Sequence, residues 1–187
     1  MNILKEGTGE DAILMLHGRG STAEDILTLS KFFNMSSYAF TSKNNQWYPL
    51  PFMFPKSQNE PYLSESLSLV RDAYTKLKES HNKVFILGFS QGACLALEYA
   101  SKNYVDGVIA FSGGLIGESN ELNVETKSNI FLSCSDNDPH IPLNRLMETI
   151  KIFKDNNSNL ISFIYSNNSH TITSEEIQKS ISFIANL

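Results

Sequence analysis

Short apolar runs alternate with longer amphipathic segments along the chain, and this alternation constrains the fold more than any other feature of the sequence. Short apolar runs predict buried strands, whereas apolar residues at every third or fourth position predict helices. Strands separated by helices are typical of βαβ units, which build a parallel sheet. The predicted strands are Ala12–Leu16, Tyr38–Thr41, Val84–Leu87, Gly107–Phe111, Asn129–Ser133 and Leu160–Tyr165.

Five amphipathic helices are expected around these strands. Capping boxes predict that the first helix begins at Ser21-x-x-Glu24 and the last at Thr173-x-x-Glu176. The sequence therefore predicts a single α/β domain over residues 1–187, with a mostly parallel central sheet of about six strands and helices on both faces. Residues 2–4 are expected to add at most a short edge strand. The apolar stripes of the helices are Ile26, Leu29 and Phe33; Leu63, Leu67, Val70, Tyr74 and Leu77; Ala93, Ala96, Leu97 and Ala100; Leu143, Met147 and Ile150; and Ile177, Ile181 and Ile184.

The composition argues against several classes of protein. Hydrophobic residues make up 41% and charged residues 19% of the chain, which is typical of a globular protein. The formal net charge of −5, without any cluster of Lys and Arg, gives no reason to expect nucleic acid as a partner. We expect no stable membrane insertion and no signal peptide, and hence a cytoplasmic protein. Cys94 and Cys134 lack metal-ligand spacing, so we expect buried thiols, no metal and no cofactor.

The pentapeptide GFSQG, residues 88–92, follows a predicted strand and precedes a predicted helix. It matches G-x-S-x-G, the pattern of a nucleophile elbow, in the structural context that this motif requires. A direct turn from strand to helix strains the residue at its apex and leaves little room for side chains two positions away, so glycine is needed on both flanks. Ser90 is therefore the predicted nucleophile. The alternative is a glycine-rich turn in which Ser90 only caps the helix.

A serine nucleophile needs a base, and the chain has 4 histidines to offer. His170 follows the last predicted strand, at the sheet edge where Ser90 is expected, and is the predicted base. His81 precedes a strand and belongs at the opposite edge. His17 begins a glycine-rich turn, and His140 lies two residues after a candidate acid.

The acid of such a site follows the serine and precedes the histidine along the chain. The stretch SDNDPHIP, residues 135–142, follows the fifth predicted strand and offers two aspartates. Asp138 is the predicted acid because it opens the pattern D-x-x-[VI]-P, and Asp136 is the reserve candidate. Ser90, Asp138 and His170 are thus expected to meet at one edge of the sheet.

Acyl transfer also needs backbone amides that hold the oxyanion. One amide follows the nucleophile and the other comes from the loop after the first central strand. Gln91 and Arg19 hold these positions, and the glycines of His17-Gly18-Arg19-Gly20 allow the loop to curl toward the serine. His17 is expected to brace the loop through hydrogen bonds; the alternative for HGRG is an ordinary glycine turn.

These residues resemble those of a known family, the small phospholipase/carboxylesterase group of α/β-hydrolases, which includes acyl-protein thioesterases. LHGRG, GFSQGACLALEYA, FSGGLIG, SDNDPHIP and the late His-Thr-Ile match the pattern of that group in order, over almost the whole chain. The sequence departs from the pattern at Ser135, where a glycine is usual, and at residues 166–169, which replace a glycine-rich approach to the histidine. The resemblance implies an α/β-hydrolase fold and a serine carboxylesterase with a triad of Ser90, Asp138 and His170 and oxyanion amides from Arg19 and Gln91.

The long irregular segment 42–61 is expected to supply part of the substrate site, and whether it is a mobile lid stays open. An apolar lining favours uncharged esters of medium chain length, while lysophospholipids and thioesters remain alternatives. The alternative for the lining residues themselves is that they only pack the segment onto the domain. The predicted lining residues are Trp47, Tyr48, Phe52, Leu115 and Ile116.

Two other interpretations are weighed against the esterase. One is a catalytically inactive relative that binds an acyl or aromatic ligand in the same pocket. The other is a dienelactone-type hydrolase, although many of those carry cysteine where this chain has Ser90. The expected partner is a small-molecule ester with an apolar acyl or aryl group, and a homodimer formed through exposed aromatic residues stays open.

Overall fold

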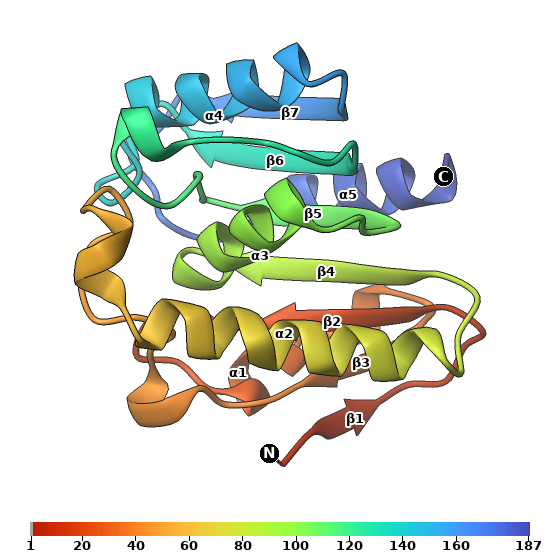
Figure 1. The fold of residues 1–187 in the computed structure, drawn as a ribbon. Coiled ribbons are helices and arrows are strands. Elements are labelled where there is room, and N and C mark those ends of the chain that lie inside the picture. Colours follow the sequence, from red (N-terminus) through yellow and green to blue (C-terminus); the bar gives the residue numbers. More distant parts are fainter. Residues whose placement is uncertain (1) are drawn as a thin grey trace.

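The computed structural model describes residues 2–187 and contains one seven-stranded sheet in the order β1-β3-β2-β4-β5-β6-β7. All neighbouring strands are parallel except β1 and β3, which pair antiparallel (Figure 1). The predicted mostly parallel sheet is confirmed, and the short edge strand at the N-terminus makes the seventh strand. The strands are β1 (Leu4–Glu6), β2 (Ala12–Leu16), β3 (Ser36–Ala39), β4 (Val84–Phe89), β5 (Gly107–Phe111), β6 (Asn129–Ser135) and β7 (Asn159–Tyr165).

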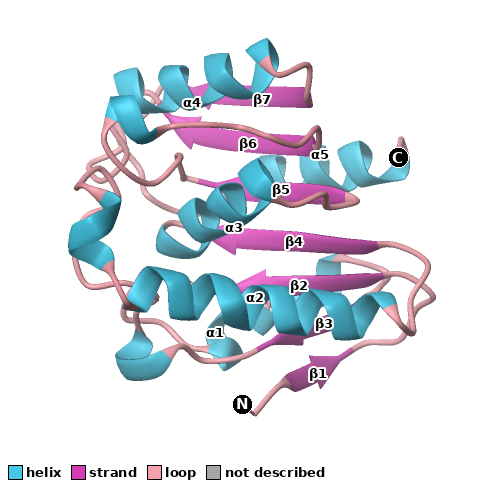
Figure 2. Ribbon diagram, in the orientation of Figure 1, coloured by secondary structure: helices cyan, strands magenta, loops and turns pink. Residues whose placement is uncertain are grey.

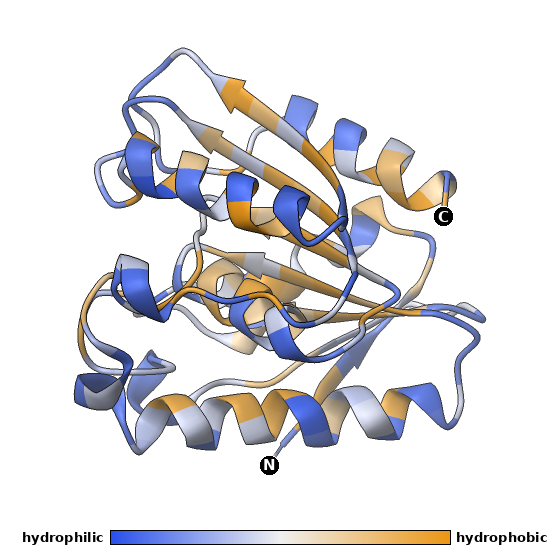
Figure 3. Cartoon of the chain, turned by 45° about the horizontal axis from the view of Figure 1, so that its top comes forward, coloured by the Kyte–Doolittle hydropathy of each residue, from blue (hydrophilic) through white to orange (hydrophobic). Residues whose placement is uncertain are grey.

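Five α-helices cover the sheet on both faces, as predicted (Figure 2). Three of them pack with one face of the sheet in a large apolar cluster, and the other two pack on the opposite face in a second cluster. Figure 3 shows apolar residues concentrated along the strands and polar residues on the outer turns of the surrounding helices. The first three helices are α2 (Tyr62–Lys78), α3 (Gln91–Lys102) and α4 (Leu143–Asp155), and the other two are α1 (Ala23–Leu27) and α5 (Ser174–Ala185).

Strand β3 begins earlier than predicted, at Ser36 instead of Tyr38. Ser36 and Ser37 are both buried, although their hydroxyl groups make them look like loop residues in the sequence. The Ser36 hydroxyl is satisfied because it donates to the Gly9 carbonyl and accepts from the Gly9 N–H. The partner lies 27 residues earlier in the chain, so a long-range hydrogen bond allows a polar residue to start this buried strand.

The predicted start of the first helix was wrong by one residue. Thr22, not Ser21, is the N-cap: its hydroxyl accepts from the Asp25 N–H, and the Asp25 carboxylate accepts from the Thr22 N–H. The helix also ends at Leu27, so Leu29 and Phe33 lie beyond it, although Phe33 still packs in the core. The capping box that was predicted for the last helix is confirmed.

The buried face of α4 differs from the predicted one. Leu143 and Met147 are 39% and 48% exposed, whereas Leu146, Ile150 and Phe153 are buried. Both sets have helical spacing and share Ile150, so periodicity alone does not distinguish them. The packing of α4 against the sheet selects the second set.

Within residues 2–187, no helix is both long and apolar enough to cross a lipid bilayer. The loops that follow the parallel strands gather at one edge of the sheet, at the left of Figure 1. Ligands of open α/β sheets bind at this carboxyl edge of the strands.

The corrected face of α4 makes a testable prediction. Phe153→Ala should lower the free energy of unfolding by about 3–5 kcal/mol, because it removes a fully buried aromatic ring. The matched control Met147→Ala removes an exposed side chain and should change stability by less than about 0.5 kcal/mol. Urea denaturation measures both values, and equal losses for the two variants would contradict the observed orientation of the helix.

Candidate active site

Ser90 lies at the turn between β4 and α3 with a strained backbone, φ 53° and ψ −117°. The two glycines of the motif are sterically required. A Cβ at Gly88 would lie 2.4 Å from the Gly92 carbonyl carbon, and a Cβ at Gly92 would lie 2.1 Å from the Leu16 carbonyl oxygen. The turn therefore presses the start of α3 against the end of β2 and leaves Ser90 at the carboxyl edge of the sheet.

The three residues predicted as a triad meet at this edge. The His170 Nε2 atom is 2.8 Å from the Ser90 hydroxyl oxygen, and its Nδ1 atom is 2.7 Å from Asp138 Oδ2. An ionised carboxylate only accepts hydrogen bonds, so Nδ1 carries the proton and Nε2 is free to accept from the Ser90 O–H. This is the arrangement in which an imidazole can take a proton from an alcohol.

Asp138 is 8% exposed and its carboxylate is fully hydrogen-bonded. Oδ1 accepts from the backbone amides of His140 and Ile141, while Oδ2 faces His170. Burial alone raises the pKa of this carboxyl group, but the hydrogen bonds from His170 and from the two amides outweigh it, so the pKa of Asp138 is lowered. The group therefore stays ionised and can stabilise a positive charge on His170.

The reserve candidate Asp136 does not contact His170. Its carboxylate accepts from the hydroxyl group of Ser166 instead. Ser135, where the sequence departs from the family pattern, donates its hydroxyl proton to the Ser169 carbonyl at 2.7 Å. These side-chain bonds connect the loop that carries the acid to the loop that carries the base, in place of the glycines of the usual pattern.

Two aromatic rings pack against the His170 ring. The ring centroids of Phe89 and His140 lie 4.9 Å and 4.6 Å from that of His170. Sequence reasoning considered His140 only as a candidate base and gave Phe89 no role. Phe89 is the variable second residue of G-x-S-x-G, so the motif itself carries no signal for its packing.

The predicted oxyanion donors are the backbone amides of Arg19 and Gln91. Both residues line the cavity beside Ser90, and within residues 2–187 neither amide has a hydrogen-bond partner. The Gly18 backbone comes so close that a Cβ there would lie 3.5 Å from the Ser90 Cβ. Gln91 is also the first residue of α3, where the helix dipole favours negative charge.

His17 braces the loop after β2, as expected. Its Nε2 accepts from the Ser42 N–H, which leaves Nδ1 protonated to donate to the Gly18 carbonyl at 2.7 Å. Burial lowers the pKa of His17, so the ring is held neutral. Since both ring nitrogens are occupied, His17 is not available to take a proton from Ser90.

A cavity of about 520 Å³ opens beside Ser90, within the size range of small-molecule sites. Burial raises the pKa of the Cys94 thiol to about 12, so this neighbour of Ser90 stays protonated and is no competing nucleophile. Tyr48 and Phe52 line the cavity, as predicted. The full lining is Gly18, Arg19, Ser21, Tyr48, Pro49, Pro51, Phe52, Phe89, Ser90, Gln91, Cys94, His140, Ile141 and His170.

The other three predicted lining residues do not reach this cavity. Trp47 lies beneath the loop after β2, where its indole N–H donates to the His17 carbonyl. Leu115 and Ile116 are fully buried in the apolar core. Their large apolar side chains stabilise the fold behind the cavity wall, and the prediction that they contact substrate is corrected.

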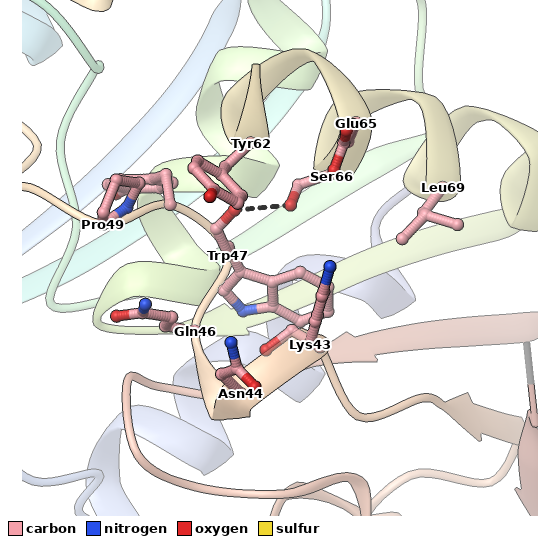
Figure 4. A pocket seen from close by; sticks show the side chains of 11 residues that line it. Lys43, Asn44, Gln46, Trp47, Pro49, Tyr62, Glu65, Ser66 and Leu69 are labelled. Carbon is pink, nitrogen blue, oxygen red and sulfur yellow. Dashed lines mark hydrogen bonds between the residues drawn. The ribbon is translucent and has the colours of Figure 1, made fainter. Parts of the chain in front are cut away.

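A second cavity, between segment 42–49 and α2, has a volume of only about 50 Å³ (Figure 4). Its walls include Trp47 and Ser66, and the Ser66 hydroxyl donates to the Trp47 carbonyl. This space accommodates a few water molecules and is too small for an ester substrate. Within residues 2–187, no group of three or more His, Cys, Asp and Glu side chains is placed to hold a metal ion.

Comparison with known proteins agrees with this geometry. The model of the family described as Phospholipase/Carboxylesterase matches residues 3–187. The crystal structure of a phospholipase/carboxylesterase from Dyadobacter fermentans is 37% identical, with a TM-score of 0.89, and the match covers 98% of this chain and 95% of that chain. No match is found among curated proteins.

More distant structures share the fold. The carboxylesterase of Bacillus cereus is 17% identical with a TM-score of 0.80, over 100% of this chain and 94% of that one. Acyl-protein thioesterase 2 of Zea mays is 16% identical with a TM-score of 0.80, over 99% and 98% of the two chains. The predicted α/β-hydrolase fold is thereby confirmed.

The contact between the start of α3 and β2 generates a prediction. Gly92→Ala should lower the free energy of unfolding by about 3 kcal/mol and move Ser90, because the new methyl group would collide with the Leu16 carbonyl oxygen. Thermal denaturation and esterase assays measure the two effects. A variant with unchanged melting temperature and activity would show that this close approach does not exist.

Proposed function

Because this chain belongs to the phospholipase/carboxylesterase family, we propose that it hydrolyses carboxylic esters with Ser90 as nucleophile, His170 as general base and Asp138 as the acid that orients the base. The observation that carries this proposal is the continuous set of hydrogen bonds from the Ser90 hydroxyl through the His170 ring to the Asp138 carboxylate. The 2.8 Å bond allows His170 to take the Ser90 proton, and the 2.7 Å bond to Asp138 orients the ring.

The reaction follows from these contacts. His170 Nε2 takes the Ser90 proton while the serine oxygen attacks the acyl carbonyl, and the amides of Arg19 and Gln91 stabilise the resulting oxyanion. His170 returns the proton to the leaving alcohol, which leaves an acyl-enzyme. A water molecule deprotonated by His170 then attacks this ester, and the carboxylic acid departs. The ionised carboxylate of Asp138 stabilises the protonated ring in both steps.

The cavity supports a small ester as substrate. One wall is apolar, with Pro51, Phe52 and Ile141, and suits an acyl or aryl group. Thioesters and lysophospholipids are compatible with the same chemistry and belong in the same substrate panel. A cytoplasmic location and a homodimer stay predictions from the sequence.

Replacing the nucleophile tests the reaction directly. Ser90→Ala should lower kcat for p-nitrophenyl acetate by about 10⁴-fold or more, with the fold intact by circular dichroism. A fluorophosphonate probe should label the native protein and leave the variant unlabelled. Undiminished hydrolysis by the variant would disprove the mechanism, and a native protein that hydrolyses no ester would favour a binding protein.

The two aspartates provide a matched pair. Asp138→Asn should lower kcat by about 10³-fold or more, because the neutral amide no longer stabilises the protonated His170 ring. Asp136→Asn alters a side chain that contacts Ser166 and not His170, so kcat should change by less than about threefold. Steady-state kinetics with one ester measures both, and the reverse ranking would reassign the acid.

A further inference from the structure

Segment 45–50 lies along the loop after β2 and is attached to it by many hydrogen bonds. The Gly20 N–H donates to the Asn45 carbonyl at 2.7 Å, and the Asn45 side-chain amide donates to the Ser21 carbonyl. The guanidinium of Arg19, an exposed residue, also binds this segment. It donates four hydrogen bonds of 2.8–3.2 Å, to Gln46 Oε1 and to the carbonyl groups of Tyr48, Pro49 and Leu50.

The Gln91 side chain makes a second attachment. Its Nε2 donates to the Tyr48 carbonyl at 2.7 Å, and its Oε1 accepts from the Trp47 N–H at 3.0 Å. The residue is only 6% exposed, so water does not replace these bonds readily. The side-chain amide of Gln91 thus makes two hydrogen bonds to the backbone of residues 47 and 48, one as acceptor and one as donor.

Arg19 and Gln91 therefore act twice in the proposed reaction. Their backbone amides face the oxyanion, and their side chains hold segment 45–50, which carries Tyr48 to the cavity wall. We propose that the side chains of Arg19 and Gln91 are positioning elements, which use segment 45–50 as a common anchor to fix the two oxyanion amides relative to Ser90. This inference rests on the proposed esterase reaction.

The physical basis is the short distance between the hydrogen-bonded side chain and the backbone amide of the same residue. In both residues the anchored side chain and the oxyanion amide belong to the same amino acid, so a shift of the side chain is transmitted to the backbone. A displacement of about 1 Å in a catalytic group can lower the rate by about 10²-fold. The Tyr48 carbonyl accepts from both side chains, so it connects the two halves of the oxyanion hole.

Ser66 on α2 provides a matched control. Its hydroxyl donates to the Trp47 carbonyl at 2.6 Å, so it anchors the same segment. Unlike Gln91, Ser66 lies outside the cavity beside Ser90 and contributes no amide to the oxyanion hole. Loss of the Ser66 hydroxyl therefore removes one attachment of segment 45–50 and leaves every hydrogen bond of the Arg19 and Gln91 side chains in place.

The test compares Gln91→Met with Ser66→Ala in hydrolysis of p-nitrophenyl butyrate. Gln91→Met keeps the side-chain volume and the backbone amide but removes both anchoring bonds. We expect kcat to fall by about 10- to 100-fold with KM within about threefold of the native value, because the lost interaction stabilises the transition state. Ser66→Ala should keep kcat within about threefold.

Equal losses of kcat in the two variants would overturn the proposal, because segment 45–50 would then act only by supporting the cavity wall. Native kcat in Gln91→Met would also overturn it. Arg19→Lys provides a second measurement on an exposed side chain if Gln91→Met does not fold. It keeps the positive charge but loses the planar guanidinium group that makes the four hydrogen bonds, and kcat should fall by about 3- to 10-fold.

The native protein separates this inference from the proposed function. Its fluorophosphonate labelling and its ester hydrolysis test the esterase reaction, whether or not the Arg19 and Gln91 side chains have a positioning role. If the native protein is labelled and active while Gln91→Met and Arg19→Lys keep native kcat, only the positioning role fails. If the native protein shows neither labelling nor hydrolysis, the esterase proposal fails and the positioning role fails with it.

Discussion

The close approach of α3 to β2, which is possible only because Gly92 has no side chain, determines the geometry of the half of the site that contains Ser90. It forces a direct turn from β4 into α3 and fixes Ser90 in its strained conformation. It also places the loop that carries Arg19 next to the first amide of α3. The proposed nucleophile and both proposed oxyanion amides thus depend on one contact between a helix and a strand.

The acid and the base depend on a different pair of elements. Strands β6 and β7 pair in register up to Ser135 and Tyr165, and the two loops that follow remain hydrogen-bonded to each other through the Asp136–Ser166 and Ser135–Ser169 contacts. Hydrogen bonding between these two parts of the chain thus continues beyond the ends of β6 and β7. Serine hydroxyl groups thus support these loops at positions where glycines are usual in the family.

Much of the fold was predictable because buried parallel strands are apolar on both faces and therefore stand out in the sequence. The meeting of Ser90, Asp138 and His170 was predictable for a related reason, since the carboxyl ends of parallel strands share one edge. The predictions failed where tertiary packing, and not the local sequence pattern, determines which residues are buried. The buried start of β3 depends on hydrogen bonds between Ser36 and the distant Gly9, and in α4 two apolar stripes share Ile150.

The cavity wall was the least predictable part, because an aromatic-rich segment gives no signal of which rings face a substrate. In segment 42–61, Tyr48 and Phe52 reach the cavity, whereas Trp47 turns inward. Several of the hydrogen bonds to the backbone of this segment come from the side chains of Arg19 and Gln91, two residues that the sequence analysis assigned only to the oxyanion hole. The sequence motif indicates the role of the backbone amide of such a residue but not the role of its side chain.

The far end of segment 42–61 is also attached to the domain, which bears on how the cavity selects its substrate. Lys56 forms an ion pair of 2.6 Å with the buried Glu98 of α3, and the Phe52 carbonyl accepts from the Gly117 N–H. Arg145 of α4 lies over the Phe52 ring, 6.0 Å from its centroid. These contacts attach the part of the segment that follows Phe52, while Arg19 and Gln91 attach residues 45–50. In the proposed reaction, the segment that limits the space for the acyl group is therefore also the segment that holds the two proposed oxyanion amides.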